Sequence, residues 1–113
     1  WALEVEENGQ VYDALIVCRY GVNPRYVLVD NPDYPEIAKD YVATFMKARE
    51  LPVDVFLGSH GFWYGLAEKY AQLQNRSPGD PNPFVDREGY LAHVDMQEQN
   101  FKQMLAGQKA GPR

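Results

Sequence analysis

The dipeptide Asn8-Gly9 constrains the fold of this chain more than any other short feature. Both residue types tolerate a positive φ, so the pair favours a two-residue hairpin turn. Residues 1–6 before it alternate between apolar and polar side chains, which is typical of a half-buried strand. Residues 11–18 after it form a more continuously apolar run, which predicts a more deeply buried strand. The sequence therefore predicts a β-hairpin that begins at the first residue.

The next part of the chain predicts one helix after a short extended segment. Residues 26–29 have an extended pattern and lie between segments rich in turn residues. Four apolar side chains then recur at helical spacing: Ile37, Tyr41, Phe45 and Ala48. The helix should begin near Pro35, with Asp33 as its cap, and it should end at Leu51-Pro52.

The second half of the chain predicts one more strand and two more helices. Residues 53–57 are almost all apolar, which predicts a short strand that is buried on both faces. Helices are expected over residues 63–74 and 86–105, and Gly107 and Gly111-Pro112 should end the last one. A hairpin, further strands and three helices predict a layered α/β fold, with one domain over residues 1–113.

Charge and composition exclude several classes of partner. The formal net charge is -5, so a phosphate backbone would be repelled and nucleic-acid binding is not expected. No apolar run approaches the roughly 20 residues of a membrane span, so no membrane partner is expected. The single cysteine, Cys18, lies in an apolar run and is expected to be a buried thiol. Because the chain begins at Trp1 without a Met, we expect that it is processed or cut from a longer protein.

His60 follows the expected strand of residues 53–57 and precedes a helix. In open α/β sheets, ligand sites collect at the carboxyl ends of strands. Gly58, Ser59 and Gly61 are small and let the backbone bend and approach closely. From these residues alone, His60 could be a metal ligand, a base or a hydrogen-bonded structural histidine.

Three segments of the sequence carry a resemblance to a known family. They are VNPRYVLVDNPDYPEIAKDY at residues 22–41, LPVDVFLGSH at residues 51–60 and NPFVDREGY at residues 82–90. In this order and spacing they closely resemble the C-terminal part of the class B, subclass 3 metallo-β-lactamases. Trp1 also looks like the end of the TTW segment that follows a zinc histidine in that family. The resemblance covers essentially the whole chain and implies the C-terminal half of an αββα sandwich.

The resemblance implies a role for His60 in a zinc site. The family holds two zinc ions at one edge of the sandwich, and the last histidine that binds the second zinc matches His60. A metal-bound hydroxide attacks the β-lactam carbonyl in this family, because zinc lowers the pKa of bound water and acts as a Lewis acid. The resemblance therefore implies Zn²⁺ as cofactor, two per complete active site, with β-lactam antibiotics as substrates and a periplasmic or secreted location.

Most of the family's zinc ligands are absent from this sequence. The His-x-His-x-Asp-His motif and the family's middle histidine are missing. The other histidine, His93, lies in the last expected helix, where the family has no ligand, so a surface or structural role is expected. One imidazole does not make a zinc site, since catalytic sites use three protein ligands and a water. The chain alone is therefore expected to be inactive, with the N-terminal half of its domain missing and no catalytic residue of its own.

Two residues near the expected site are candidate substrate contacts. Arg19 stands where close relatives have a serine near the second metal. If Arg19 pointed inward it would disfavour a nearby Zn²⁺ but could pair the carboxylate of an acidic substrate, and an arginine turned to solvent is an equal alternative. Phe62 could line a substrate lip, whereas Trp63 and Tyr64 are expected to pack the next helix onto the sheet.

Three functions stay open at the level of sequence. The first is the C-terminal part of a zinc-dependent β-lactamase. The second is another hydrolase of the same fold that acts on a lactone or a thioester. The third is a non-catalytic half that associates with a missing N-terminal half, or with itself, through the exposed edge strand of residues 1–6.

Overall fold

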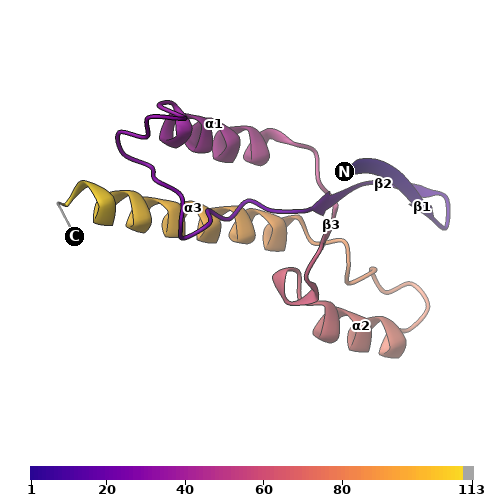
Figure 1. The fold of residues 1–113 in the computed structure, drawn as a ribbon. Coiled ribbons are helices and arrows are strands. Elements are labelled where there is room, and N and C mark those ends of the chain that lie inside the picture. Colours follow the sequence, from indigo (N-terminus) through magenta and orange to yellow (C-terminus); the bar gives the residue numbers. More distant parts are fainter. Residues whose placement is uncertain (111–113) are drawn as a thin grey trace. The chain divides into compact units, whose positions relative to one another are not determined.

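The computed structural model describes residues 1–110 (Figure 1). The chain divides into two compact units. Unit 1 consists of Trp1–Arg19 and Pro52–His93, and unit 2 consists of Tyr20–Leu51 and the residues from Val94 onward. The elements in chain order are β1 (Ala2–Glu7), β2 (Gln10–Val17), α1 (Ile37–Glu50), β3 (Val55–Gly58), the 3₁₀ turn η1 (Gly61–Trp63), α2 (Leu66–Asn75) and α3 (Arg87–Lys109).

Unit 1 is built on a three-stranded sheet in the order β1-β2-β3. β1 and β2 are antiparallel, and Asn8 and Gly9 between them have φ values of 53° and 82°, so the predicted hairpin is confirmed. β2 and β3 are parallel, with Val17 opposite Gly58, so both strands end at the same edge. Within residues 1–110, β1 pairs only with β2, and its residues Ala2 to Glu6 are exposed.

The core of unit 1 gathers around Phe56 in the middle of β3. The Phe56 side chain is 0% exposed. Its ring lies edge-on to Tyr90 at the start of α3, with centroids 5.5 Å apart, and edge-on to Tyr64 after η1, at 6.1 Å. Aromatic pairs favour this tilted geometry over face-to-face stacking. One buried ring therefore connects β3 to the segments that follow it, and Tyr64 packs on the sheet through this ring.

Unit 2 packs α1 against the later turns of α3. Phe45 and Phe101 are both buried, with ring centroids 5.7 Å apart, and Tyr41 lies 5.5 Å from Phe101. Ile37 and Ala48 are buried on the same face of α1. The apolar stripe predicted for this helix is therefore confirmed, with Tyr41 only half-buried at its side.

The extended segment of residues 26–29 does not pair as a strand in the part of the chain that the structure describes. The Leu28 N–H donates to the Gln108 side chain at 2.6 Å, and the Gln108 amide donates to the Tyr26 carbonyl at 2.9 Å. One glutamine side chain thus bonds two backbone groups that a neighbouring strand would otherwise bond. Of the further strands that the sequence predicts, the described residues contain β3 alone.

The start of α1 differs from the prediction. The helix begins at Ile37, and Glu36 occupies the N-cap position. Asp33 does not cap it, since no side chain caps this end of the helix. The backbone N–H groups of Asp33 and Tyr34 instead donate to the Asn31 side chain, at 2.9 and 3.0 Å. Asn31 therefore closes a turn of its own before the helix begins, as asparagine side chains often do.

The other helices also differ at their ends. α2 begins only at Leu66, because Trp63 belongs to the 3₁₀ turn η1 and Gly65, at the N-cap, has a left-handed φ of 70°. α3 continues through Gly107 to Lys109. A glycine costs a helix interior only about 1 kcal/mol, so Gly107 does not have to end it. The predicted stop at Gly111-Pro112 lies outside the described residues.

Cys18 is exposed, so the prediction of a buried thiol is wrong. The buried part of the apolar run ends one residue earlier than the sequence indicates. β2 ends at Val17, which is 3% exposed, and Cys18 already belongs to the segment that leaves the sheet.

Candidate functional site

His60 lies just beyond the end of β3, beside the end of β2. The Ser59 N–H donates to the carbonyl of Val17 at 3.2 Å, and the Ser59 hydroxyl donates to the carbonyl of Cys18 at 3.1 Å. These two bonds tie the turn before His60 to the neighbouring strand. The His60 side chain is exposed at this strand end, which is the position that the sequence predicts. Its role as a metal ligand stays a prediction.

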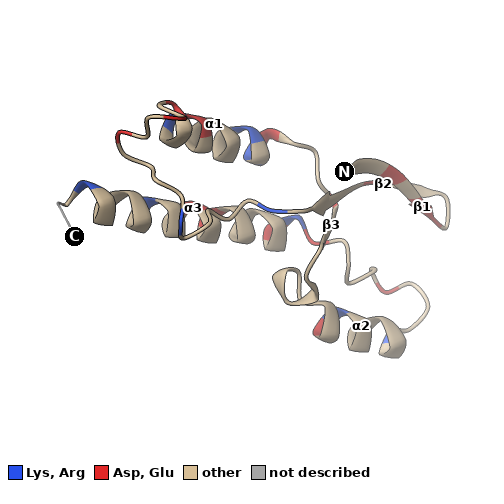
Figure 2. Cartoon of the chain, viewed as in Figure 1, with Lys and Arg blue, Asp and Glu red and all other residues tan. Residues whose placement is uncertain are grey.

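The 3₁₀ turn η1 brings two aromatic rings next to His60. The Trp63 N–H donates to the carbonyl of His60 at 3.1 Å, which folds the chain back on itself. The indole of Trp63 lies edge-on to the imidazole, with centroids 4.7 Å apart and an interplanar angle of 76°. The Phe62 ring stacks on the imidazole at 5.7 Å and is 81% exposed. Residues 55–67 contain no Asp, Glu, Lys or Arg, so the ribbon between β3 and α2 is tan in Figure 2.

His93 lies on the inner side of Trp63. Its ring centroid is 5.5 Å from that of Trp63 and 5.3 Å from that of Phe56, and only 4% of the residue is exposed. Burial lowers the pKa of His93, since the charged imidazolium is disfavoured away from water. A structural position is therefore confirmed and a surface position is excluded. The contact with Trp63 links two segments that are distant in sequence, so no local pattern predicts it.

Gly58 allows Trp63 to approach the end of β3 closely. A Cβ added at Gly58 would lie 3.0 Å from Cε3 of Trp63 and 3.4 Å from the carbonyl oxygen of Val17. We expect Gly58→Ala to lower the free energy of unfolding by about 1–3 kcal/mol, because the indole has to move. Urea denaturation measures this change.

A second glycine provides the control for Gly58→Ala. A Cβ at Gly107 in α3 would meet nothing within 4 Å, so Gly107→Ala should raise stability by up to about 1 kcal/mol through helix propensity. If Gly58→Ala were as stable as the unchanged chain, the close contact between Gly58 and Trp63 would be contradicted.

The other predicted site residues, Arg19 and Phe62, follow the ends of β2 and β3 at the same edge of the sheet. Arg19 is exposed in the segment after β2, and its contact with a substrate carboxylate stays a prediction. Phe62, Leu66 and Tyr70 line an open hollow of about 670 Å³. Leu66 and Tyr70 are 40% and 54% exposed, so these two apolar side chains of α2 do not face a core in this unit. Phe62 as a substrate contact also stays a prediction.

The buried residue of α2 is Lys69, to which no sequence signal points. Its Nζ lies 2.9 Å from Oδ2 of Asp86 and 5.7 and 5.8 Å from the ring centroids of Phe56 and Tyr64. A carboxylate and two aromatic faces thus surround the ammonium group. Lysine is almost never fully buried unless it is paired, so only the tertiary contact with Asp86 explains its position.

Asp86 also caps α3. One oxygen of its side chain accepts the Gly89 N–H at 2.9 Å. Burial alone would raise the pKa of Asp86, but the hydrogen bonds from Lys69 and Gly89 outweigh it and hold the pKa below its ordinary value of 3.8. The charged carboxylate is therefore the form that the fold favours.

This lowered pKa gives a prediction for acid stability. A carboxyl group whose pKa is lowered in the folded state stabilises the fold above its ordinary pKa, and the stabilisation is lost as the pH falls below that value. We expect Asp86 to make the free energy of unfolding decrease as the pH falls below about 4. Asp86→Asn should make this dependence shallower, and urea denaturation at several pH values measures it. An unchanged slope would contradict the ion pair with Lys69.

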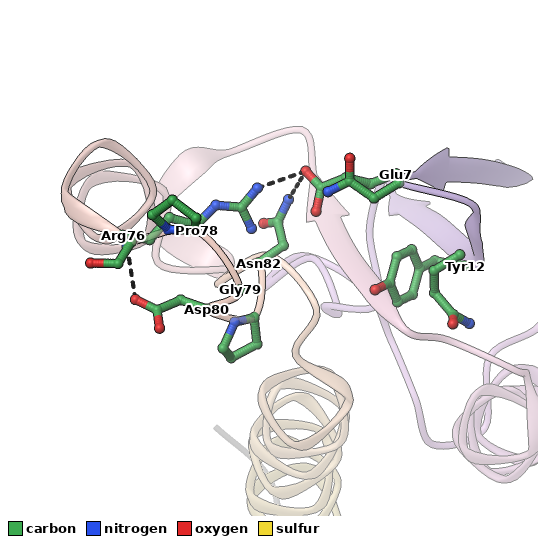
Figure 3. Close-up of a pocket in the computed structure, with 11 residues that line it drawn as sticks. Glu7, Tyr12, Arg76, Pro78, Gly79, Asp80 and Asn82 are labelled. Carbon is green, nitrogen blue, oxygen red and sulfur yellow. Dashed lines mark hydrogen bonds and ion pairs between the residues drawn. The ribbon is translucent and has the colours of Figure 1, made fainter.

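A second hollow lies near the hairpin turn, at the opposite end of β2 from the strand end that leads to His60 (Figure 3). The Glu7 carboxylate accepts hydrogen bonds from Arg76 at 2.9 Å and from Asn82 at 3.1 Å. The hydrogen bond from Arg76 contributes most to lowering the pKa of Glu7. These bonds tie the loop after α2 to the hairpin, and we assign this hollow no role in the candidate site.

The donor set of this chain does not fit a complete zinc site. Within residues 1–110, no group of three or more His, Cys, Asp or Glu side chains lies close enough to hold a metal ion. His60 is the candidate ligand, and a catalytic zinc needs three protein ligands. A metal at His60 would therefore need ligands from outside the described residues. No helix in this part of the chain is long and apolar enough to cross a membrane.

Comparison with solved structures identifies relatives of this fold. The chain is similar to native FEZ-1 metallo-β-lactamase from Legionella gormanii, with 37% identity, a TM-score of 0.86, and coverage of 98% of this chain and 41% of that chain. It is also similar to BJP-1, a subclass B3 metallo-β-lactamase of Bradyrhizobium japonicum, with 33% identity, a TM-score of 0.81, and coverage of 97% of this chain and 40% of that chain. MEM-A1, a subclass B3 enzyme from a soil metagenome library, is 17% identical with a TM-score of 0.82, which shows likeness of fold alone. No protein-family model and no curated protein matches the chain.

In its sheet and its three helices, the chain is similar to part of a metallo-β-lactamase. The likeness to BJP-1, at 33% identity, points to subclass B3. The predicted resemblance and the predicted mixed α/β fold are both confirmed. The chain spans 41% of the length of the FEZ-1 chain that it matches, so the activity of a whole protein is a separate question.

Proposed function

We propose that this chain is the C-terminal part of a zinc-dependent β-lactamase of subclass B3, to which it supplies His60 as one ligand of the second zinc. The observation that carries the proposal is the exposed imidazole at the shared end of β2 and β3, in a chain 37% identical to FEZ-1. The other ligands come from polypeptide beyond the described residues, so the chain alone is expected to be inactive. By its resemblance to the family, the protein acts in the periplasm or is secreted.

The residues around His60 have separate roles in this proposal. The exposed Phe62 ring offers an apolar wall beside the imidazole. Arg19, in the segment that follows β2, offers a cation to the carboxylate that β-lactam antibiotics carry. The turn itself contains no charged side chain, so an apolar part of the substrate could approach it without displacing strongly bound water.

Turnover assays on the full-length protein that carries this chain test the proposal. With zinc supplied, we expect hydrolysis of a cephalosporin or a penicillin that a chelator abolishes and added zinc restores. Hydrolysis of a lactone or a thioester, with no β-lactam opened, would favour the second class of hydrolase with this fold. Failure to open any β-lactam with zinc present would contradict the proposal.

A second candidate function is a non-catalytic half that associates through its edge strand. Exposed apolar side chains on β1 and on the residue before it support this candidate. Trp1, Leu3 and Val5 are 85%, 46% and 37% exposed. An open edge strand with apolar side chains tends to pair with another strand. Analytical ultracentrifugation tests it: association that Leu3→Lys weakens would favour this candidate, and a monomer at all concentrations would contradict self-association.

A further inference from the structure

We propose that Trp63 and His93 are positioning residues that fix the orientation of the His60 imidazole. The inference rests on the proposed function only in taking His60 as the functional group. In unit 1, a row of four rings runs from the buried core to the exposed strand end. In order, the rings belong to Phe56, His93, Trp63 and His60.

The exposed His60 imidazole needs a neighbouring ring to keep one orientation. An exposed side chain on a turn can normally exchange between several rotamers. The backbone of His60 is held by the bonds of Ser59 to the end of β2, and its ring meets the edge of Trp63 at 4.7 Å. The other neighbouring ring, Phe62, is 81% exposed and is therefore poorly held itself. Trp63 is thus the better-supported surface against which the imidazole can rest.

The Trp63 indole is held from two sides. On one side, the indole lies directly against the backbone of Gly58, because a Cβ there would be 3.0 Å from Cε3. On the other side it meets the ring of His93 at 5.5 Å. His93 is 4% exposed and rests on Phe56, which is 0% exposed. The position of Trp63 is therefore set in part by His93, which lies one ring further from His60 in the row.

A positioning role for His93 requires a flat ring, whereas ordinary packing requires only a side chain of the right volume. If His93 only filled space, an aliphatic side chain of similar volume would serve equally well, and its loss would change stability alone. If it acts as a flat support for the indole, His93→Phe should keep the orientation of His60, whereas His93→Leu should not. Stability and the orientation of His60 would then change independently in these two variants.

Nuclear magnetic resonance on the unmodified chain provides the first test. The sequence contains two histidines and two tryptophans, so selective labelling gives one signal set for each of His60, His93, Trp63 and Trp1. We expect cross-relaxation between ring protons of His60 and Trp63, and between those of Trp63 and His93. Trp1 is 85% exposed and supplies the reference signal of an unpacked indole. Absence of the contact between His60 and Trp63 in the folded chain would overturn the proposal.

Variants provide the second test. In His93→Leu, the contact between His60 and Trp63 should be lost and the ring-proton shifts of His60 should move to those of a free histidine, while His93→Phe should retain both. Phe62→Ala is the matched control, because it removes the other ring beside His60 and should leave the contact with Trp63 in place. Circular dichroism establishes that each variant is folded.

The outcomes are independent of catalysis. A contact that persists in folded His93→Leu would overturn the role of His93. If His93→Leu does not fold, the proposal is decided by the contacts of the unmodified chain and by His93→Phe, which should keep them. All these signals are recorded without metal or substrate, so a protein that opened no β-lactam would contradict the proposed function and leave this inference standing.

Discussion

Replacing Phe56 by alanine should lower the free energy of unfolding by about 3–5 kcal/mol, as expected for a large ring removed from a packed core. The side chain is 0% exposed and contacts three rings, those of Tyr64, Tyr90 and His93. Its loss would leave a cavity among these rings, and the surroundings can collapse into it only in part. Urea denaturation followed by circular dichroism measures the change.

Phe62→Ala is the matched control for Phe56→Ala. It removes the same ring from a residue that is 81% exposed, so the free energy of unfolding should change by no more than about 0.5 kcal/mol. A loss below about 1 kcal/mol for Phe56→Ala would contradict its place at the centre of unit 1.

Replacing His60 by alanine in the full-length protein should lower kcat/KM for a β-lactam by roughly 100-fold or more. Removing a residue that only hydrogen-bonds a metal ligand typically lowers metal affinity or activity roughly 10–100-fold. Removing the ligand itself should lower activity at least as much. The imidazole is exposed and its loss opens no cavity, so the free energy of unfolding should stay within about 0.5 kcal/mol of the original.

Two measurements decide this prediction for His60. Steady-state kinetics give the change in kcat/KM, and denaturation gives the change in stability. Near-normal turnover by a folded His60→Ala variant would show that this imidazole takes no part in the reaction. A large loss of stability would instead show that the side chain is structural.

The parts of the fold that the sequence predicts correctly are those set by local chemistry. Asn8-Gly9 specifies the hairpin because both residues adopt positive φ, whatever the rest of the chain does. The spacing of Ile37, Phe45 and Ala48 specifies the buried face of α1 for the same kind of reason. The strand-end position of His60 follows from a short apolar run before a turn of small residues.

The errors arise where a distant side chain replaces a local interaction. Gln108 bonds the backbone of the segment at residues 26–29, which therefore needs no strand partner. Lys69 is buried because Asp86 lies beside it, and neither residue predicts the other from sequence. The contact of His93 with Trp63 is of the same kind, and so the ring row behind His60 becomes visible only in three dimensions.

The number of zinc ions bound tightly by the isolated chain and by the full-length protein tests the central claim most directly. Elemental analysis after dialysis, with the oligomeric state recorded, gives both numbers. We predict that the isolated chain of 113 residues retains no stoichiometric zinc, because His60 is the one candidate ligand among residues 1–110 and no group of three possible ligands lies there. The full-length protein should retain two zinc ions, and His60→Ala should weaken the binding of one of them. Tight, stoichiometric zinc in the monomeric isolated chain would contradict the account.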